Sequence, residues 1–97
     1  MINVHWTHNA IRHLADIYDF ISKDSRYYAQ RMVDKITKRS EQISFEPFSG
    51  RIVPEYQNSN VREIFEGPYR IIYLVLKRKI DVLAVIHGAR LMPDDIF

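Results

Sequence analysis

The sequence predicts an α+β fold, in which a small antiparallel sheet packs against an N-terminal helical hairpin. The chain has 97 residues, 46% of them hydrophobic, which suits a single domain over residues 1–97 with its own core. The first half carries apolar residues at helical spacing, and the second half carries strand-like runs separated by turns. The predicted order is β-α-α-β-β-β(-β), the bracket allowing for a short edge strand.

The N-terminal half is predicted to form one strand and two helices. Residues 2–6 alternate apolar and polar side chains, which is the period of a strand with one buried face. Thr7 and Ser25 are predicted helix N-caps. The apolar positions that follow them recur at helical spacing: Ala10, Leu14, Ile17, Tyr18 and Ile21, then Ala29, Met32, Val33, Ile36, Ser40 and Ile43. Because the break at 23–25 is short, the two helices are predicted to be antiparallel neighbours.

The C-terminal half is predicted to form the sheet. Pro47 and Gly50 mark a loop, and Pro54 moves the candidate strand 51–56 to an edge. Further strands are predicted at residues 61–66, 69–76 and 80–87, with turns at 67–68 and 77–79. The last two strands are nearly continuous apolar runs, which is typical of central strands covered on both faces. In the tail, residues 93–95 are predicted to open one helical turn.

Composition excludes several classes of protein. The chain has no cysteine, so it has no disulfide and no thiolate metal site, and a reducing cytoplasm is expected. Lys and Arg number 14 against 12 Asp and Glu, a difference too small to predict nucleic-acid binding from net charge. No apolar run approaches the length of a membrane span, and the N-terminus lacks the features of a signal peptide. His5, His8 and His13 lack metal-ligand spacing, so neither a metal nor a cofactor is expected.

The basic residues of the second half are the main candidates for function. Arg70 opens an apolar strand, where a guanidinium needs either a carboxylate such as Glu63 or Glu66 or an open groove. His87 and Arg90 close the last strand, where His87 can exchange a proton and Arg90 can bind an anion. Arg62 is a weaker candidate, because it is adjacent to Glu63 in a strand and the two point to opposite faces.

Three tyrosines fit the core pattern least well. Tyr27 and Tyr28 stand at the head of the second helix, and Tyr56 follows the candidate edge strand. We therefore predict that these side chains contact a partner.

Four segments in order resemble the RelE/ParE superfamily of type II toxin–antitoxin toxins. They are residues 47–51 (PFSGR), 61–64 (VREI), 67–73 (GPYRIIY) and 82–90 (VLAVIHGAR), and they follow the opening strand and helical pair. The resemblance runs the whole length of the chain. It implies a growth-inhibiting toxin that a cognate antitoxin silences in a hetero-oligomer. The antitoxin segment would contact Tyr27, Tyr28, Tyr56 and Arg70.

The resemblance leaves two targets open. RelE-like members cut messenger RNA on the ribosome with a cluster of lysines and arginines and a late tyrosine or histidine, and Arg70, His87 and Arg90 would be catalytic here. However, the only lysines past residue 50 are Lys77 and Lys79. The ParE-like branch, whose members inhibit DNA gyrase, is therefore the closer resemblance, with Arg62, Arg70, His87 and Arg90 as target-binding residues. A degenerate toxin that only binds its antitoxin is a third alternative.

Overall fold

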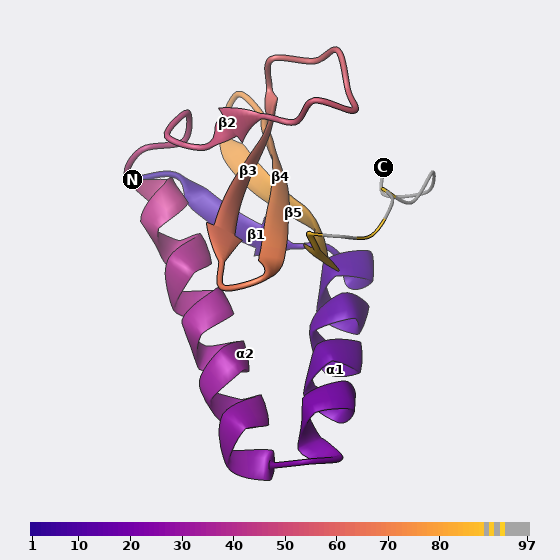
Figure 1. The fold of residues 1–97 in the computed structure, drawn as a ribbon. Helices are drawn as coiled ribbons and strands as arrows, with labels where there is room; N and C mark the ends of the chain where they lie inside the picture. The colour runs from indigo at the N-terminus through magenta and orange to yellow at the C-terminus, as the bar shows by residue number, and fades with distance from the viewer. Residues whose placement is uncertain (89, 91, 93–97) are drawn as a thin grey trace.

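The computed structural model describes residues 1–88, 90 and 92, and it confirms the α+β class (Figure 1). A strand and two helices precede four strands, and a short 3-10 turn follows the second helix. The elements are β1 (Asn3–Trp6), α1 (His8–Ser22), α2 (Arg26–Glu41), η1 (Gln42–Ser44), β2 (Arg51–Ile52), β3 (Val61–Glu66), β4 (Tyr69–Val75) and β5 (Lys79–His87). The helical turn predicted at residues 93–95 lies outside the described residues.

Both helices begin at the predicted caps. The Thr7 hydroxyl accepts a hydrogen bond from the Ala10 N–H at 3.2 Å, and the Ser25 hydroxyl accepts one from the Tyr28 N–H at 3.2 Å. Each bond satisfies one of the N–H groups that the first turn of a helix leaves without a partner. The chain therefore reverses at residues 23–25, and α1 and α2 lie side by side (Figure 1).

The sheet has the strand order β1-β5-β4-β3-β2 and is mixed rather than wholly antiparallel. Strands β2 to β5 pair antiparallel in sequence, as predicted. Strand β1 instead lies parallel to β5, with Asn3 opposite Lys79 and Trp6 opposite Val82. A parallel pair needs a long crossover, and the chain between β1 and β5 provides one.

Strand β2 is shorter than the predicted strand 51–56. It ends at Ile52, and the Tyr56 N–H donates to the Val53 carbonyl at 3.2 Å, so the chain turns there. Pro54 explains the early end, because it has no N–H to donate to a neighbouring strand.

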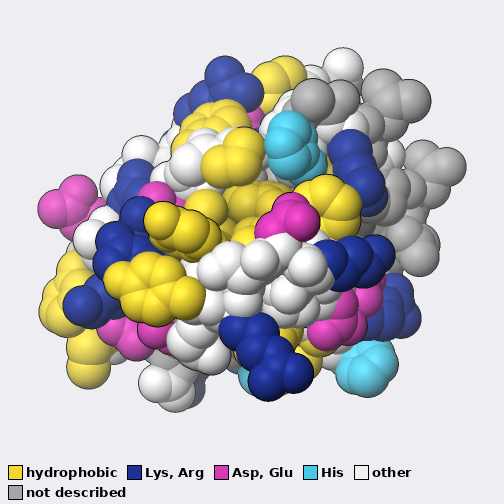
Figure 2. All heavy atoms as spheres, turned by 60° about the horizontal axis from the view of Figure 1, so that its bottom comes forward, with side chains coloured by type: hydrophobic (Ala, Val, Ile, Leu, Met, Phe, Trp, Pro, Cys, Tyr) yellow, Lys and Arg dark blue, Asp and Glu magenta, His cyan; other side chains and the backbone are white. Residues whose placement is uncertain are grey.

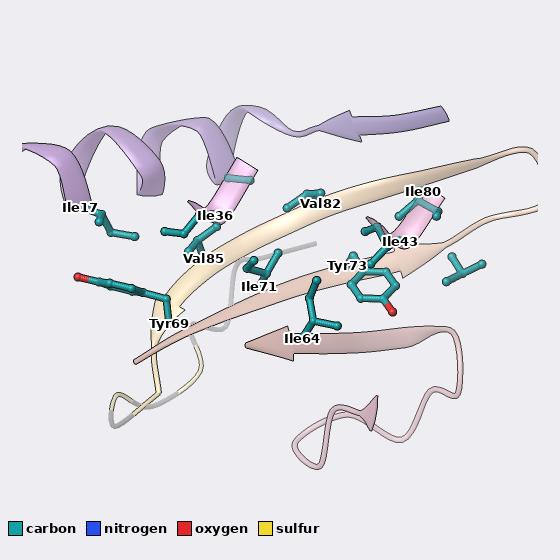
Figure 3. Close-up of a cluster of buried hydrophobic side chains, with 12 residues drawn as sticks. Ile17, Ile36, Ile43, Ile64, Tyr69, Ile71, Tyr73, Ile80, Val82 and Val85 are labelled. Carbon is teal, nitrogen blue, oxygen red and sulfur yellow. The ribbon is translucent and has the colours of Figure 1, made fainter. Parts of the chain in front are cut away.

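Buried apolar side chains cover both faces of the sheet. On the helix side, Ile17 and Ile36 pack against strand residues that include Ile71, Tyr73 and Val85 (Figure 3). On the other face, a second cluster contains Val53, Val61, Ile72, Leu83, Ala84 and Ile86, with Tyr56 and Met92 packed against it. The loop after β2 therefore covers the face that the helices leave open, which explains the continuous apolar runs of β4 and β5.

The helical hairpin extends beyond the sheet. In Figure 1 both helices continue past the β3–β4 turn to the tip of the hairpin. At that turn Gly67 has φ 56°, a conformation that glycine adopts without strain, and a Cβ there would lie 3.6 Å from the Met32 methyl of α2. The parts of the helices beyond this contact expose Phe20, Tyr27 and Tyr28.

Candidate functional site: a groove between helix α1 and strand β5

A groove of about 950 Å³ runs between α1 and the end of β5. Its polar lining comes from both elements and from the chain that follows β5: His13, Asp16, His87 and Arg90. Its apolar lining consists of Ile17, Phe20, Tyr69, Val85, Ile86 and Met92. Figure 2, which brings the helical tip forward, shows hydrophobic side chains gathered in the middle of the view, with acidic, basic and histidine side chains beside them. Such a lining suits a partner that carries both apolar and charged groups.

The structure brings together two of the predicted site residues, His87 and Arg90. His87 is exposed at the end of β5, opposite Tyr69, and their rings lie edge to face with centroids 5.7 Å apart. The Arg90 N–H donates to the His87 carbonyl at 2.9 Å, and the Gly88 N–H donates to the Pro68 carbonyl at 2.7 Å. These bonds fix the chain at the mouth of the groove, so the imidazole and the guanidinium are presented from one short segment.

His13 is a groove residue that the sequence prediction missed. Its Nδ1 accepts a hydrogen bond from the Val85 N–H at 3.2 Å, so Nδ1 carries no proton in this contact. The spacing of residues in the sequence could have indicated this position. His13, Asp16, Ile17 and Phe20 recur at the intervals of one helix face. Within residues 1–88, 90 and 92, no group of three or more His, Cys, Asp or Glu is placed to hold a metal ion.

The sequence predicts that Arg70 binds the target or the antitoxin, or that it takes part in catalysis. Arg70 does not line this groove. It is 6% exposed and lies on the sheet face opposite the helices. Its Nε donates to Glu63 at 2.6 Å, and its Nη1 and Nη2 donate to the two carboxylate oxygens of Glu55 at 2.9 Å each. Of the two predicted partners, Glu63 is therefore correct and Glu66 is not, and Glu55 is a third that the sequence did not indicate.

The hydrogen bonds between Arg70 and its two glutamates shift the pKa values of Arg70 and Glu55. The fork of hydrogen bonds from Arg70 lowers the pKa of Glu55 below its usual 4.5, and the same bonds raise the pKa of Arg70. Glu63 is fully buried and also accepts from the Arg51 Nε at 2.5 Å. Two carboxylates and two guanidiniums thus form one neutral network, and Arg70 has no free charge to offer a ligand.

Arg62 lies at the β2 edge of the sheet, away from the groove. Its Nε donates to the Ser59 carbonyl at 2.7 Å, and its Nη1 donates to the Gly50 carbonyl at 3.1 Å. Its guanidinium also lies 5.0 Å from the centroid of the Phe48 ring. Arg62, Arg70 and Arg90 therefore occupy three different environments rather than one site.

The three tyrosines that are predicted to contact the antitoxin lie in two different places. Tyr27 and Tyr28 are 63% and 64% exposed and lie edge to face at 5.4 Å. They line a hollow of about 440 Å³ between the helices, together with Ile21, Arg31, Met32 and Lys35. Tyr56 is partly buried against the second core cluster, so it does not join them.

A helical pair packed on one face of a sheet is the fold that the RelE/ParE resemblance led us to expect. The family model described as "ParE toxin of type II toxin-antitoxin system, parDE" matches residues 4–92. The chain belongs to the ParE toxin family and is the toxin of a type II toxin–antitoxin system.

One relative and one solved structure are also similar to this chain. The chain is 30% identical over 92 residues to Toxin RelE2 of Caulobacter vibrioides, a match that covers 94% of this chain and all of the relative. The solved structure titled "Chromosomal ParDE TA system from P. aeruginosa" superposes with a TM-score of 0.75 at 21% identity, over 90% of this chain and 96% of that one. None of the described helices is long and apolar enough to cross a membrane.

Proposed function

We propose that this toxin arrests growth in the cytoplasm by inhibiting DNA gyrase, as ParE-like members of the superfamily do. It would act as a binding protein rather than as an enzyme. The observation that carries the proposal is the engagement of Arg70 by Glu55 and Glu63. Cleavage of RNA without a metal needs an acid, a base and cations that stabilise the phosphorane charge. Arg70 is neutralised and, being paired with Ile86 rather than His87, points to the sheet face opposite His87, so the predicted catalytic set loses one of its two arginines.

The groove supplies the proposed contact with gyrase. His87 and Arg90 stand at its mouth and present donors for hydrogen bonds, and Ile17, Phe20 and Tyr69 offer apolar surface behind them. Arginine and aromatic side chains with apolar surroundings are the usual anchors of protein interfaces. We assign His87 and Arg90 to target binding on this ground.

An antitoxin would silence the toxin by covering the same surface. Its segment would run from the groove to the hollow at Tyr27 and Tyr28, where the lining carries Arg31 and Lys35 but no acidic residue. An amphipathic segment with acidic side chains fits this lining, because its apolar face enters the hollow while its carboxylates meet the two cations. Occupation of the groove would exclude gyrase from His87 and Arg90.

One observation supports a second candidate, ribosome-dependent cleavage of messenger RNA. His13 and His87 line one groove with Arg90, and two imidazoles beside a cation can serve as base, acid and charge stabiliser. The proton on His13 would be on Nε2, since Nδ1 accepts from Val85. This candidate therefore requires His13 as well as His87.

A pulse-label time course after induced expression without antitoxin tests the proposal. We expect DNA synthesis to fall before protein synthesis. Arg90→Ala should weaken the arrest, and Arg78→Ala, which removes an exposed arginine in the β4–β5 turn, should not. An earlier fall in protein synthesis would favour the ribonuclease, and continued growth with a folded chain would favour a degenerate toxin.

A further inference from the structure

Helix α2 carries a row of cations along one side. Positions that are three or four residues apart lie next to each other on the surface of a helix. Lys35 follows Arg31 by four residues and precedes Arg39 by four, and Lys38 stands three residues after Lys35. We call these four side chains the α2 ridge. At a rise of 1.5 Å per residue, the ridge is about 12 Å long.

The charge of the chain is concentrated in this helix. Helix α2 contains five Lys and Arg against two Asp and Glu, a net charge of +3, whereas the net charge of the whole chain is +2. Its two acids, Asp34 and Glu41, are seven residues apart and share a neighbouring strip of the helix. Asp34 accepts a hydrogen bond from the Gln30 side chain at 2.9 Å. A local basic surface therefore exists that the net charge of the chain does not reveal.

The cations of the α2 ridge keep their charge. Within residues 1–88, 90 and 92, none of the four forms a salt bridge with a carboxylate. Arg31 donates to the Tyr27 hydroxyl at 3.2 Å, and Arg39 donates to the Phe65 carbonyl at 3.1 Å. Both acceptors are neutral, so they orient the guanidiniums without cancelling them. An anionic ligand would meet two cations that are already held in place.

The helix dipole explains only part of the ridge. Cations in the last turn of a helix stabilise its C-terminus, and Lys38 and Arg39 stand in the last turn of α2. Arg31 and Lys35 lie further back, where the dipole has little effect. A role in stabilising the helix therefore does not account for the continuous row.

The second half of the ridge offers charge without apolar surface. In α2 the exposed large apolar side chains are Tyr27 and Tyr28, both in the first turn. Lys38 and Arg39 lie outside the helical hollow, so an amphipathic antitoxin segment would find no apolar surface beside them. Centres of protein interfaces are rich in aromatic residues and poor in lysine. Lysine and arginine without apolar neighbours are instead typical of contacts with the phosphates of a nucleic acid.

We propose that the α2 ridge binds the phosphate backbone of a double-stranded nucleic acid without reading its sequence. Each strand of a DNA duplex carries one phosphate per about 3.4 Å of axis, so a row of about 12 Å can meet up to four of them. Single strands are bound on open aromatic rings, and membranes are bound by a helix with an exposed apolar face. Neither feature is present in the second half of α2.

The position of the ridge makes it independent of the groove. In Figure 1 α2 forms one flank of the molecule, and α1, beside the end of β5, forms the other. A duplex on the ridge would therefore leave His87 and Arg90 accessible. The proposal goes beyond the proposed function, because it requires neither gyrase nor the antitoxin.

Fluorescence anisotropy of a labelled, random-sequence DNA duplex, titrated with the full-length chain at several salt concentrations, tests the proposal. Four phosphate contacts predict a slope of about −3.6 for log K against log salt, or a loss on the order of a hundredfold from about 50 to about 200 mM salt. Lys35→Gln/Lys38→Gln should reduce the slope to about −1.8. Lys77→Gln/Arg78→Gln, which removes the same charge from the exposed β4–β5 turn, should leave it unchanged.

Two further measurements locate the contact and identify the ligand. Backbone NMR signals of the wild-type chain should shift mainly within residues 31–39 when the duplex is added. An RNA duplex of equal length should give the same slope, and the tighter of the two duplexes identifies the source of the phosphates. Lys35 and Lys38 are exposed, so their replacement should leave the fold intact, which circular dichroism checks.

Several results would overturn the proposal. They are equal slopes for the wild type and Lys35→Gln/Lys38→Gln, an equal reduction in the control variant, and NMR shifts confined to residues outside α2. Tighter binding of a single-stranded thymidine oligonucleotide, or of vesicles with anionic lipid, than of either duplex would also do so. The NMR experiment uses the wild-type chain, so it decides the question even if a variant unfolds.

Discussion

Arg70 and Glu63 form a buried ion pair between neighbouring strands, with the arginine Nε 2.6 Å from the glutamate Oε1. Their side chains are 7% and 0% exposed. Glu55 completes the guanidinium fork from the loop after β2, and Arg51 binds the second oxygen of Glu63. The arginine that the sequence marks most strongly is therefore part of the sheet's own framework, and it holds the loop 53–60 against the second core cluster.

Replacement of Arg70 should destabilise the fold. Arg70→Met leaves Glu63 buried with a single exposed partner and frees Glu55, and loss of one member of a buried pair costs about 3–5 kcal/mol. We expect a fall of that size in the free energy of unfolding, measured by urea denaturation. Arg78→Met in the exposed β4–β5 turn is the control. If both variants unfold at the same urea concentration as the wild type, the structural role of Arg70 is wrong.

The pair between Glu55 and Arg70 should make stability depend on pH. Because the pKa of Glu55 is lowered in the folded state, its contribution is present above the unfolded value of 4.5 and is lost as the pH falls through the lowered pKa. Glu55 is 39% exposed, so we expect a difference of less than about 1 kcal/mol between wild type and Glu55→Gln at pH 7. Urea unfolding from neutral to acid pH should show the two curves converging. A constant difference over this range would contradict the assignment.

Tyr73 should stabilise the loop before β2. Its hydroxyl, fully buried, accepts the Gly50 N–H at 3.0 Å, so Tyr73→Phe leaves that donor unpaired at a cost of about 1–3 kcal/mol. Urea denaturation at pH 7 measures the loss, with Tyr28→Phe, whose ring is exposed, as the control. An unchanged unfolding midpoint for Tyr73→Phe would show that the bond adds nothing.

Burial also gives Tyr73 a signature at alkaline pH. It raises the pKa of Tyr73 above 10, so the stability that the neutral phenol provides is complete below pH 10 and is lost as the pH rises through the raised value. As the pH rises from 9 through the raised pKa of Tyr73, the free energy of unfolding should therefore fall more for the wild type than for Tyr73→Phe. Parallel curves for the two proteins would argue against this cause.

The helical hollow should contribute to antitoxin affinity. Tyr28→Ala removes exposed aromatic surface from its lining, and loss of an interface aromatic typically costs about 1–2 kcal/mol, or roughly five- to thirtyfold in the dissociation constant. Calorimetric titration with the antitoxin segment measures the change. Ile11→Ala is the matched control, because Ile11 is an exposed apolar residue of α1 outside both hollows. Equal affinities for wild type and Tyr28→Ala would place the antitoxin elsewhere.

Local patterns predicted the elements well because their causes are local. The caps at Thr7 and Ser25 and the two helical stripes depend on residues within a turn or two of each other. The parallel pairing of β1 with β5 joins residues 76 apart, such as Asn3 and Lys79. The alternation in residues 2–6 indicates a strand but does not show which strand pairs with it. The parallel direction of β1 relative to β5 could therefore not be predicted.

The site was predicted only in part, for the same reason. His87 and Arg90 lie close in the chain, and the structure places both on one groove. His13 reaches that groove from a helix 72 residues away from Val85, a contact that no spacing in the sequence reveals. Glu55 follows Pro54 in a loop without periodicity, so its hydrogen bonds to Arg70 could not be predicted from the sequence.

The most direct test of the central claim is a DNA supercoiling assay with purified gyrase and the purified chain. We expect wild type to inhibit supercoiling, Arg90→Ala and His87→Ala to inhibit more weakly, and Arg78→Ala to inhibit as wild type does. Addition of the antitoxin should restore supercoiling. Full gyrase activity in the presence of a folded chain that cuts messenger RNA in a reconstituted translation reaction would contradict the account and make the groove a ribonuclease site.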